Sequence, residues 1–101
     1  GLKYQGEKLA GMYPHKQVKV CEKAGADIYG PVVNTNTNKS FAWNIARTLT
    51  IIKACTDVAE IPVHVNVGMG VGGTPMAYVA PADITSRASK ALVELGRVDG
   101  L

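Results

Sequence analysis

Two stretches of this chain, 24–28 and 95–100, are built alike and limit its possible folds more than any other feature. Each runs from the end of an apolar helical pattern, through a glycine, into a segment that contains an aspartate. Another extended segment lies between them, so the expected strand starts, Ala26, Ile61 and Arg97, are 35 and 36 residues apart. A strand–helix repeat of this period is typical of a parallel sheet with right-handed crossovers.

Apolar residues at helical spacing fill the intervals between these segments. They predict helices over about 14–24, over about 40–57, and from Pro81 or Ala82 to the residue before Gly96. The expected apolar stripe of the second helix is Phe41, Ile45, Leu49 and Ile52, and that of the third is Ile84, Ala88, Ala91, Leu92 and Leu95. Pro14 suits the first position of a helix, and Gly25 suits a left-handed turn after its end. Thr37 and Ser40 are the candidate caps of the second helix.

The alternation within Ile61–Val67 helps to choose between fold classes. Val63 and Val65 alternate with His64 and Asn66, which is typical of a strand with one apolar and one polar face. Strands of open, doubly wound parallel sheets tend to be apolar on both faces, whereas a barrel strand with a polar face can line a site for a polar substrate. We therefore predict an α/β fold, a fragment of a (β/α)8 (TIM) barrel with about three strand–helix units, and a doubly wound sheet as the alternative.

The length of the chain indicates part of a larger domain. A (β/α)8 barrel needs ~250 residues, and this chain has 101, of which 47% are hydrophobic and 19% charged. The third expected strand starts at Arg97, only a few residues before the sequence stops at Leu101. At the other end, Gly1 stands where an initiator methionine would be. We expect one partial barrel domain over residues 1–101, truncated at both ends. Pro31 complicates its first strand, because proline has no amide hydrogen for the sheet.

Charge and cysteine usage exclude several classes of protein. The net charge is +3, and the lysines near the start are interleaved with acids and accompanied by no aromatic ladder, so we expect a solvated helix face and no nucleic-acid partner. Between Glu60 and Asp83 no residue is charged, but prolines and glycines interrupt this stretch, which favours buried core over a membrane span. Cys21 and Cys55 belong to no CxxC motif and are expected as free thiols. Without a signal peptide, the expected location is cytoplasmic.

Candidate site residues gather where the expected strands end, since active sites of barrels lie in the loops that follow the strands. The two complete loops of this kind, 34–40 and 68–80, are rich in asparagine and in glycine, respectively. The residues expected to bind substrate or to line the site are His64, Asn66, Gly68, Gly70, Gly72, Gly73, Asn34 and Asn36. Simpler roles stay open: His64 as a hydrogen-bonded interior residue, and the asparagines as caps of the second helix.

The glycine loop does not predict a nucleotide site. Gly68, Gly70 and Gly73 match the spacing of the dinucleotide fingerprint, but no helix opens at the third glycine and no acidic residue follows at a strand end. No lysine of a phosphate-binding P-loop follows either. The sequence predicts no metal site and offers neither an activated nucleophile nor a pair of carboxylates, so no catalytic residue is assigned within it.

Three long stretches of the chain resemble a known family. They are GPVVNTNTNKSFAWNIAR (30–47), HVNVGMGVGGTPM (64–76) and RASKALVELGRVDGL (87–101). Together they are similar to the dimethylamine methyltransferases of methanogenic archaea, and the similarity runs from about Lys8 to Leu101. Runs of this length are far more specific than any glycine motif.

This resemblance implies a function that the residues alone do not. Members of the family transfer a methyl group from dimethylamine to the cobalt(I) of a corrinoid carried by a cognate protein, in methanogenesis from methylamines. The family has longer chains, and its relatives form (β/α)8 barrels and homo-oligomers. Its in-chain electrophile, pyrrolysine, is expected directly after Val98-Asp99-Gly100-Leu101, and no cofactor is expected to bind directly. The fragment alone is then expected to be inactive.

Two alternatives to this function remain at this stage. One is a barrel enzyme that binds another small amine or a phosphate, for which phosphate on the glycine-loop amides would be the sign. The other is a non-catalytic structural fragment, which would be a stable monomer without any ligand.

Overall fold

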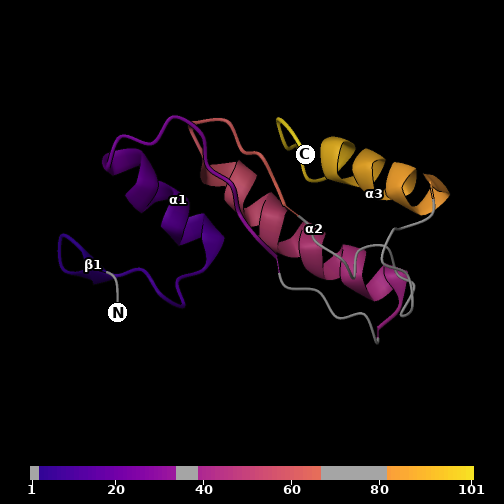
Figure 1. Ribbon diagram of the computed structural model, residues 1–101, viewed down its shortest axis with the longest axis horizontal. Coiled ribbons are helices and arrows are strands. Elements are labelled where there is room, and N and C mark those ends of the chain that lie inside the picture. Colours follow the sequence, from indigo (N-terminus) through magenta and orange to yellow (C-terminus); the bar gives the residue numbers. More distant parts are fainter. Residues whose placement is uncertain (1–2, 34–38, 67–81) are drawn as a thin grey trace.

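The computed structural model describes residues 3–33, 39–66 and 82–101. In chain order these residues form a two-stranded antiparallel sheet, β1 (Lys3–Tyr4) and β2 (Glu7–Lys8), followed by three helices, α1 (Pro14–Lys23), α2 (Phe41–Val58) and α3 (Ala82–Glu94). The long helix α2 is central, because both α1 and α3 pack against it (Figure 1).

Helix α1 begins and ends where the sequence predicts. Pro14 occupies its first turn, where a missing amide hydrogen costs nothing. Just after its end, Gly25 has a φ of 93°, which a residue with a side chain adopts only with strain. Val18, fully buried, anchors the helix to the core.

Helix α2 has the predicted extent, but of its expected apolar stripe only Ile52 is fully buried. The hydroxyl of Ser40 accepts a hydrogen bond from the amide of Trp43 at 3.1 Å, which confirms Ser40 as its cap. Its buried residues follow one stripe at spacings of four, four and three: Asn44, Thr48, Ile52 and Cys55. Phe41, Ile45 and Leu49, which we expected in this stripe, are only partly buried. The buried face thus includes two polar side chains that the hydrophobic pattern did not indicate.

Helix α3 begins where the sequence predicts and ends one residue before the predicted end. Its buried residues are Ala88 and Leu92, both in the predicted apolar stripe. Leu95, expected in the same stripe, is 60% exposed, because it follows the last helical residue.

The hairpin β1–β2 was not predicted. Lys3 pairs with Lys8 and Tyr4 with Glu7, and the two turn residues, Gln5 and Gly6, have φ values of 49° and 84°. Positive φ at both central positions is the conformation that two-residue hairpin turns prefer. The sequence signal is weak because asparagine or aspartate, rather than glutamine, usually precedes the glycine.

The three segments expected as strands lie side by side but are not regular strands. They join only through isolated parallel bridges, Tyr29 to Val63, Val32 to Asn66, and His64 to Gly100. In the part of the chain that the structure describes, the only ladder is therefore the antiparallel β1–β2 pair. The prediction of a (β/α)8 (TIM) barrel fragment with three strand–helix units is wrong: residues 3–33, 39–66 and 82–101 of this small domain form three helices and a two-stranded antiparallel sheet.

Pro31 explains why the first pair of segments forms no continuous ladder. The amide of Tyr29 donates to the carbonyl of Pro62, His64 donates to Tyr29, and Asn66 donates to Pro31, at 2.9–3.1 Å. In a parallel ladder the remaining bond would run from the amide of residue 31 to the carbonyl of His64. Proline has no amide hydrogen, so this bond is missing.

A carboxylate interrupts the second pair of segments. The amide of Val63 donates to a side-chain oxygen of Asp99 at 2.9 Å instead of to a backbone carbonyl. Asp99 and Gly100 both donate their amides to the carbonyl of Val63, at 2.9 and 3.3 Å. Because a side chain takes the place of a backbone partner, residues 98–100 do not continue as a strand.

One hydrophobic core lies between these segments and the helices. It contains residues from every described element except the hairpin: Val18, Tyr29, Val33, Ile52, Cys55, Val63, Val65, Leu92 and Val98. The face of the three segments that turns toward the helices is thus buried. Their other face, which carries Ile28, Gly30, Val32, His64 and Asn66, is exposed and is called the open face below.

Candidate functional site

The open face of the three extended segments carries the polar residues singled out in the sequence. Val63 and Val65 are 1% and 2% exposed and contact the helices, whereas His64 and Asn66 between them are exposed. The predicted alternation of an aliphatic and a polar face is confirmed. It follows from the pleat of extended backbone, which turns successive side chains to opposite sides.

The neighbouring segments add residues to this face through their register. Val32 pairs with Asn66 and His64 pairs with Gly100, and paired residues project on the same side. Val32 is 64% exposed. Gly30, two residues before Val32 in the same segment, lies so close to His64 that an added Cβ would be 3.2 Å from the carbonyl oxygen of His64. A polar strip, His64 and Asn66, is therefore bordered by an aliphatic side chain and two glycines.

The His64 imidazole lies over Gly100. A Cβ added at Gly100 would be 2.6 Å from Cδ2 of His64 and 3.3 Å from its Nε2. The backbone of His64 is fixed from both sides, since its amide donates to Tyr29 and the next amide, that of Val65, donates to Gly100. The lack of a side chain at Gly100 thus leaves space for the His64 ring, and the backbone hydrogen bonds fix the position of the His64 Cα.

The opposite side of this layer holds two buried acidic groups in their neutral forms. Burial raises the pKa of Tyr29 far above its ordinary value, and the nearby thiols of Cys55 and Cys21 act in the same direction. The Tyr29 hydroxyl donates to Oε1 of Gln17 at 2.5 Å. Burial, followed by the charge of Glu22, raises the pKa of Cys55 to about 11. These groups stabilise the core and do not reach the open face.

The open face can bind a small polar molecule that also has apolar groups. An imidazole can accept or donate a proton, and a carboxamide can both donate and accept hydrogen bonds. Val32 and the 62% exposed Ile28 offer apolar contact beside them. Among the described residues, no group of three or more His, Cys, Asp or Glu could hold a metal ion.

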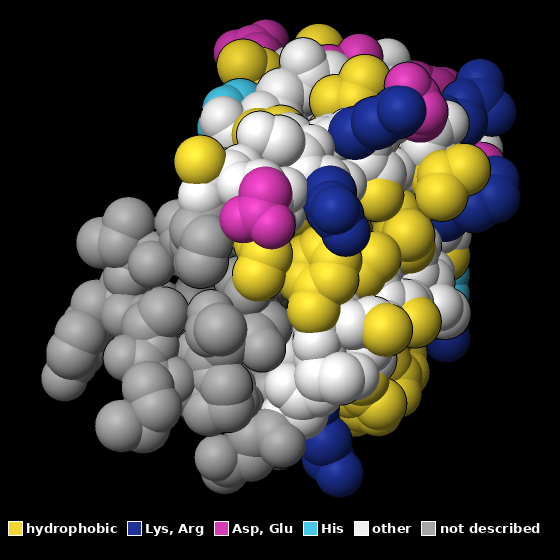
Figure 2. Space-filling model, turned by 90° about the vertical axis from the view of Figure 1, so that its right-hand side faces the viewer, with side chains coloured by type: hydrophobic (Ala, Val, Ile, Leu, Met, Phe, Trp, Pro, Cys, Tyr) yellow, Lys and Arg dark blue, Asp and Glu magenta, His cyan; other side chains and the backbone are white. Residues whose placement is uncertain are grey.

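Exposed hydrophobic side chains are also found elsewhere on the molecule. Figure 2 shows hydrophobic side chains in the open on one face, between lysine and arginine side chains. Large ones with more than 40% exposure include Tyr13, Trp43, Val93, Leu95 and Leu101. Two cations lie over the ring of Trp43, with Lys39 Nζ and Arg47 Cζ each 5.9 Å from the ring centre.

Part of the predicted site lies outside the described residues. This applies to Asn34, Asn36, Gly68, Gly70, Gly72 and Gly73. Of the predicted site residues the structure therefore brings together His64 and Asn66. The sequence did not predict Val32, Gly30 and Gly100 as their neighbours. The register that pairs these segments depends on the fold, and no local sequence pattern predicts it.

Two simpler predictions concern the rest of the chain. Cys21 and Cys55 are free thiols, as predicted. In the described ranges, no helix has the length and apolar character needed to cross a membrane.

Comparison with protein families assigns the chain to a class of enzyme. Residues 1–101 match the family described as dimethylamine methyltransferase (Dimeth_PyL). The chain therefore belongs to the dimethylamine methyltransferase family, and the family name indicates a methyltransferase that acts on dimethylamine. This confirms the resemblance seen in the sequence. No solved structure matches the chain.

Proposed function

We propose that the full-length protein transfers a methyl group from dimethylamine to the cobalt(I) of a corrinoid carried by a cognate partner protein, as a step of methanogenesis from methylamines. The observation that carries this proposal is the family match over the whole chain. In the reaction the N–CH3 bond breaks, and cobalt(I) supplies the electron pair of the new Co–C bond. The nitrogen keeps the pair of the broken bond, takes up a proton and leaves as methylamine.

The open face is the proposed substrate site. Dimethylamine has one nitrogen and two methyl groups, which suits the polar pair of His64 and Asn66 beside the aliphatic Val32. Amines are protonated near neutral pH, as the lysine pKa of about 10.4 illustrates, so the nitrogen has no free electron pair until a base removes its proton. The imidazole of His64 is the proposed base, and the carboxamide of Asn66 is the proposed hydrogen-bond partner of the amine. Asn34, Asn36 and the glycines of the loop after Val67 remain proposed lining residues.

The proposed electrophile, pyrrolysine, follows directly after Leu101. His64 pairs with Gly100 in parallel, and side chains alternate along extended backbone. If the backbone is extended from Gly100 onward, the residue after Leu101 projects on the same side as Gly100, next to Asn66. An imine on that side chain would then meet an amine held by His64 and Asn66.

The further parts of the proposal concern the working enzyme. We propose that residues 1–101 alone do not transfer methyl groups, because they do not include the proposed electrophile. The full-length enzyme is proposed to be an archaeal, cytoplasmic homo-oligomer that binds no cofactor directly and meets the corrinoid on its partner.

The first test measures methylation of the corrinoid. The full-length enzyme, its partner with cobalt(I) and dimethylamine are mixed, and the change in corrinoid absorbance is followed. We expect His64→Ala and Asn66→Ala to lower kcat/KM for dimethylamine by about tenfold or more, since an acid–base group contributes about 100-fold or more. Lys90→Ala, an exposed position on α3, is the matched control and should retain full activity. Absence of methylation in the parent enzyme would refute the function, and full activity of both site variants would refute only the site.

The second test identifies the residue after Leu101. Trypsin cleaves after Arg97, so the next peptide begins Val98-Asp99-Gly100-Leu101. We expect its mass to include a lysine-derived residue that is heavier than lysine. An ordinary amino acid at that place would contradict the proposed electrophile.

A further inference from the structure

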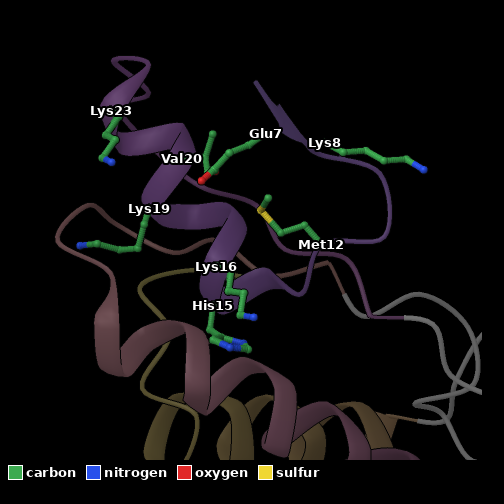
Figure 3. A pocket seen from close by; sticks show the side chains of 8 residues that line it. All are labelled: Glu7, Lys8, Met12, His15, Lys16, Lys19, Val20 and Lys23. Atoms are coloured by element: carbon green, nitrogen blue, oxygen red, sulfur yellow. The ribbon is translucent and has the colours of Figure 1, made fainter. Parts of the chain in front are cut away.

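A groove between the hairpin and helix α1 lies apart from the open face. Its volume is about 500 Å³, and the residues that line it are Glu7, Lys8, Met12, His15, Lys16, Lys19, Val20 and Lys23 (Figure 3). Met12 and Val20 are both partly buried and give it an apolar floor. This volume is in the range of sites that bind ligands.

The groove holds the excess positive charge of the whole chain. Its four lysines and one glutamate carry a formal net charge of +3, which equals the net charge of the protein. The seven other basic and seven other acidic residues cancel one another. Like charges gathered at one place repel each other, so an anionic occupant gains from all of them at once.

Three of these lysines have no partner within the described part of the protein. Lys19 donates to the carbonyl of Val58 at 3.0 Å and pairs with Glu22 at 3.2 Å. For Lys8, Lys16 and Lys23 the described residues provide neither a hydrogen bond nor an ion pair, and all three are exposed. These three lysines are therefore available to a partner, although their exposure is equally what the expected solvated helix face would show.

The arrangement fits an extended anionic partner better than a single anion. In Figure 3, Lys8 extends from the hairpin away from α1, and the lysines of α1 point in different directions instead of converging. Lys16 and Lys23 are seven residues apart, which is about 10 Å along a helix. We propose that this groove binds an acidic segment of another protein, with carboxylates on Lys8, Lys16 and Lys23 and apolar side chains on Met12 and Val20. This inference does not depend on the proposed methyl transfer.

The test uses a fluorescein-labelled acidic peptide, Glu-Glu-Leu-Glu-Glu-Leu-Glu-Glu, and fluorescence anisotropy with the full protein. The site variant combines Lys8→Gln, Lys16→Gln and Lys23→Gln. The control variant combines Lys39→Gln, Lys53→Gln and Lys90→Gln, which removes the same charge from exposed positions elsewhere. We expect the site variant to bind about tenfold more weakly and the control to bind nearly as the parent does, with binding that weakens as salt increases. Thermal unfolding checks that both variants are folded.

Several outcomes would overturn the proposal. An equal loss in both variants would mean that the peptide responds to net charge and not to the groove. No binding by the parent protein would exclude an acidic peptide as occupant. Binding of double-stranded DNA or of vesicles with anionic lipid that depends on the same three lysines, and is tighter than binding of the peptide, would assign the groove to a different partner.

Discussion

Replacing Gly96 with alanine should destabilise the domain through a clash with backbone. A Cβ at Gly96 would lie 2.7 Å from the carbonyl oxygen of Leu92 and 3.4 Å from its carbonyl carbon and Cα. Gly96 is buried and held from two sides, since its amide donates to Ala91 at 3.1 Å and its carbonyl accepts from the Thr56 hydroxyl at 2.7 Å. Relief therefore requires movement of the last turn of α3. Overpacking of this kind costs about 1–3 kcal/mol.

Gly100→Ala is the matched control. The added Cβ would make a similarly short contact, but with a side chain instead of with backbone. Its Cβ would lie 2.6 Å from Cδ2 of His64, but that ring belongs to an exposed side chain that can turn into solvent. A change of side-chain rotamer costs at most about 1 kcal/mol. Stability should then be nearly unchanged, while the NMR signals of the His64 ring shift.

Urea unfolding followed by circular dichroism measures both free energies of unfolding. With a slope of about 1.5 kcal/mol per molar urea, a loss of 2 kcal/mol lowers the midpoint by about 1.3 M. We expect this for Gly96→Ala and a shift of less than about 0.7 M for Gly100→Ala. Equal shifts in the two variants, or an unchanged midpoint for Gly96→Ala, would refute this reasoning. Either result would show that a close contact with the backbone does not determine the loss in the free energy of unfolding.

Two further predictions concern the buried side of α2. The hydroxyl of Thr48 is buried and has no hydrogen-bond partner among the described residues, so Thr48→Val should raise the free energy of unfolding by about 1 kcal/mol; a lower urea midpoint would indicate that the hydroxyl is satisfied. Cys55, fully buried, should react with iodoacetamide at pH 8 more slowly than the partly exposed Cys21. Because the folded state raises the pKa of Cys55 from 9.0 to about 11, its stabilising contribution is complete below pH 9 and is lost as the pH rises to about 11. The urea midpoint should fall over that interval, and fall less in Cys55→Ala; equal slopes would contradict the role of the thiol.

The helices could be predicted from the sequence because their signals are local. Pro14, Ser40 and the glycines after α1 and α3 act within one turn of the backbone, and each lies where the pattern indicated. The buried face of α2 could not be predicted in the same way. Asn44 and Thr48 are fully buried, and no hydrophobic pattern assigns polar side chains to the core.

The sheet was mispredicted because its pairing depends on single bonds between distant residues. The alternation around His64 correctly gave the two faces of that segment. It could not show that Pro31 would leave one bond of the ladder unmade, or that the Asp99 carboxylate would take the amide of Val63. Of the five described residues at the candidate site, His64 and Asn66 followed from the same alternation, whereas their neighbours followed only from the register.

The parallel bridges also have a consequence for the order of folding. Each joins residues 34 or 36 positions apart, so closing it requires a long loop and a large loss of chain entropy, whereas β1–β2 closes across two residues. The middle segment, with Val63 and His64, needs partners from both sides at once. Helices form in about a microsecond or less and gain stability as they pack on one another. The face that carries His64 and Asn66 is therefore assembled last, on a helical layer that is already in place.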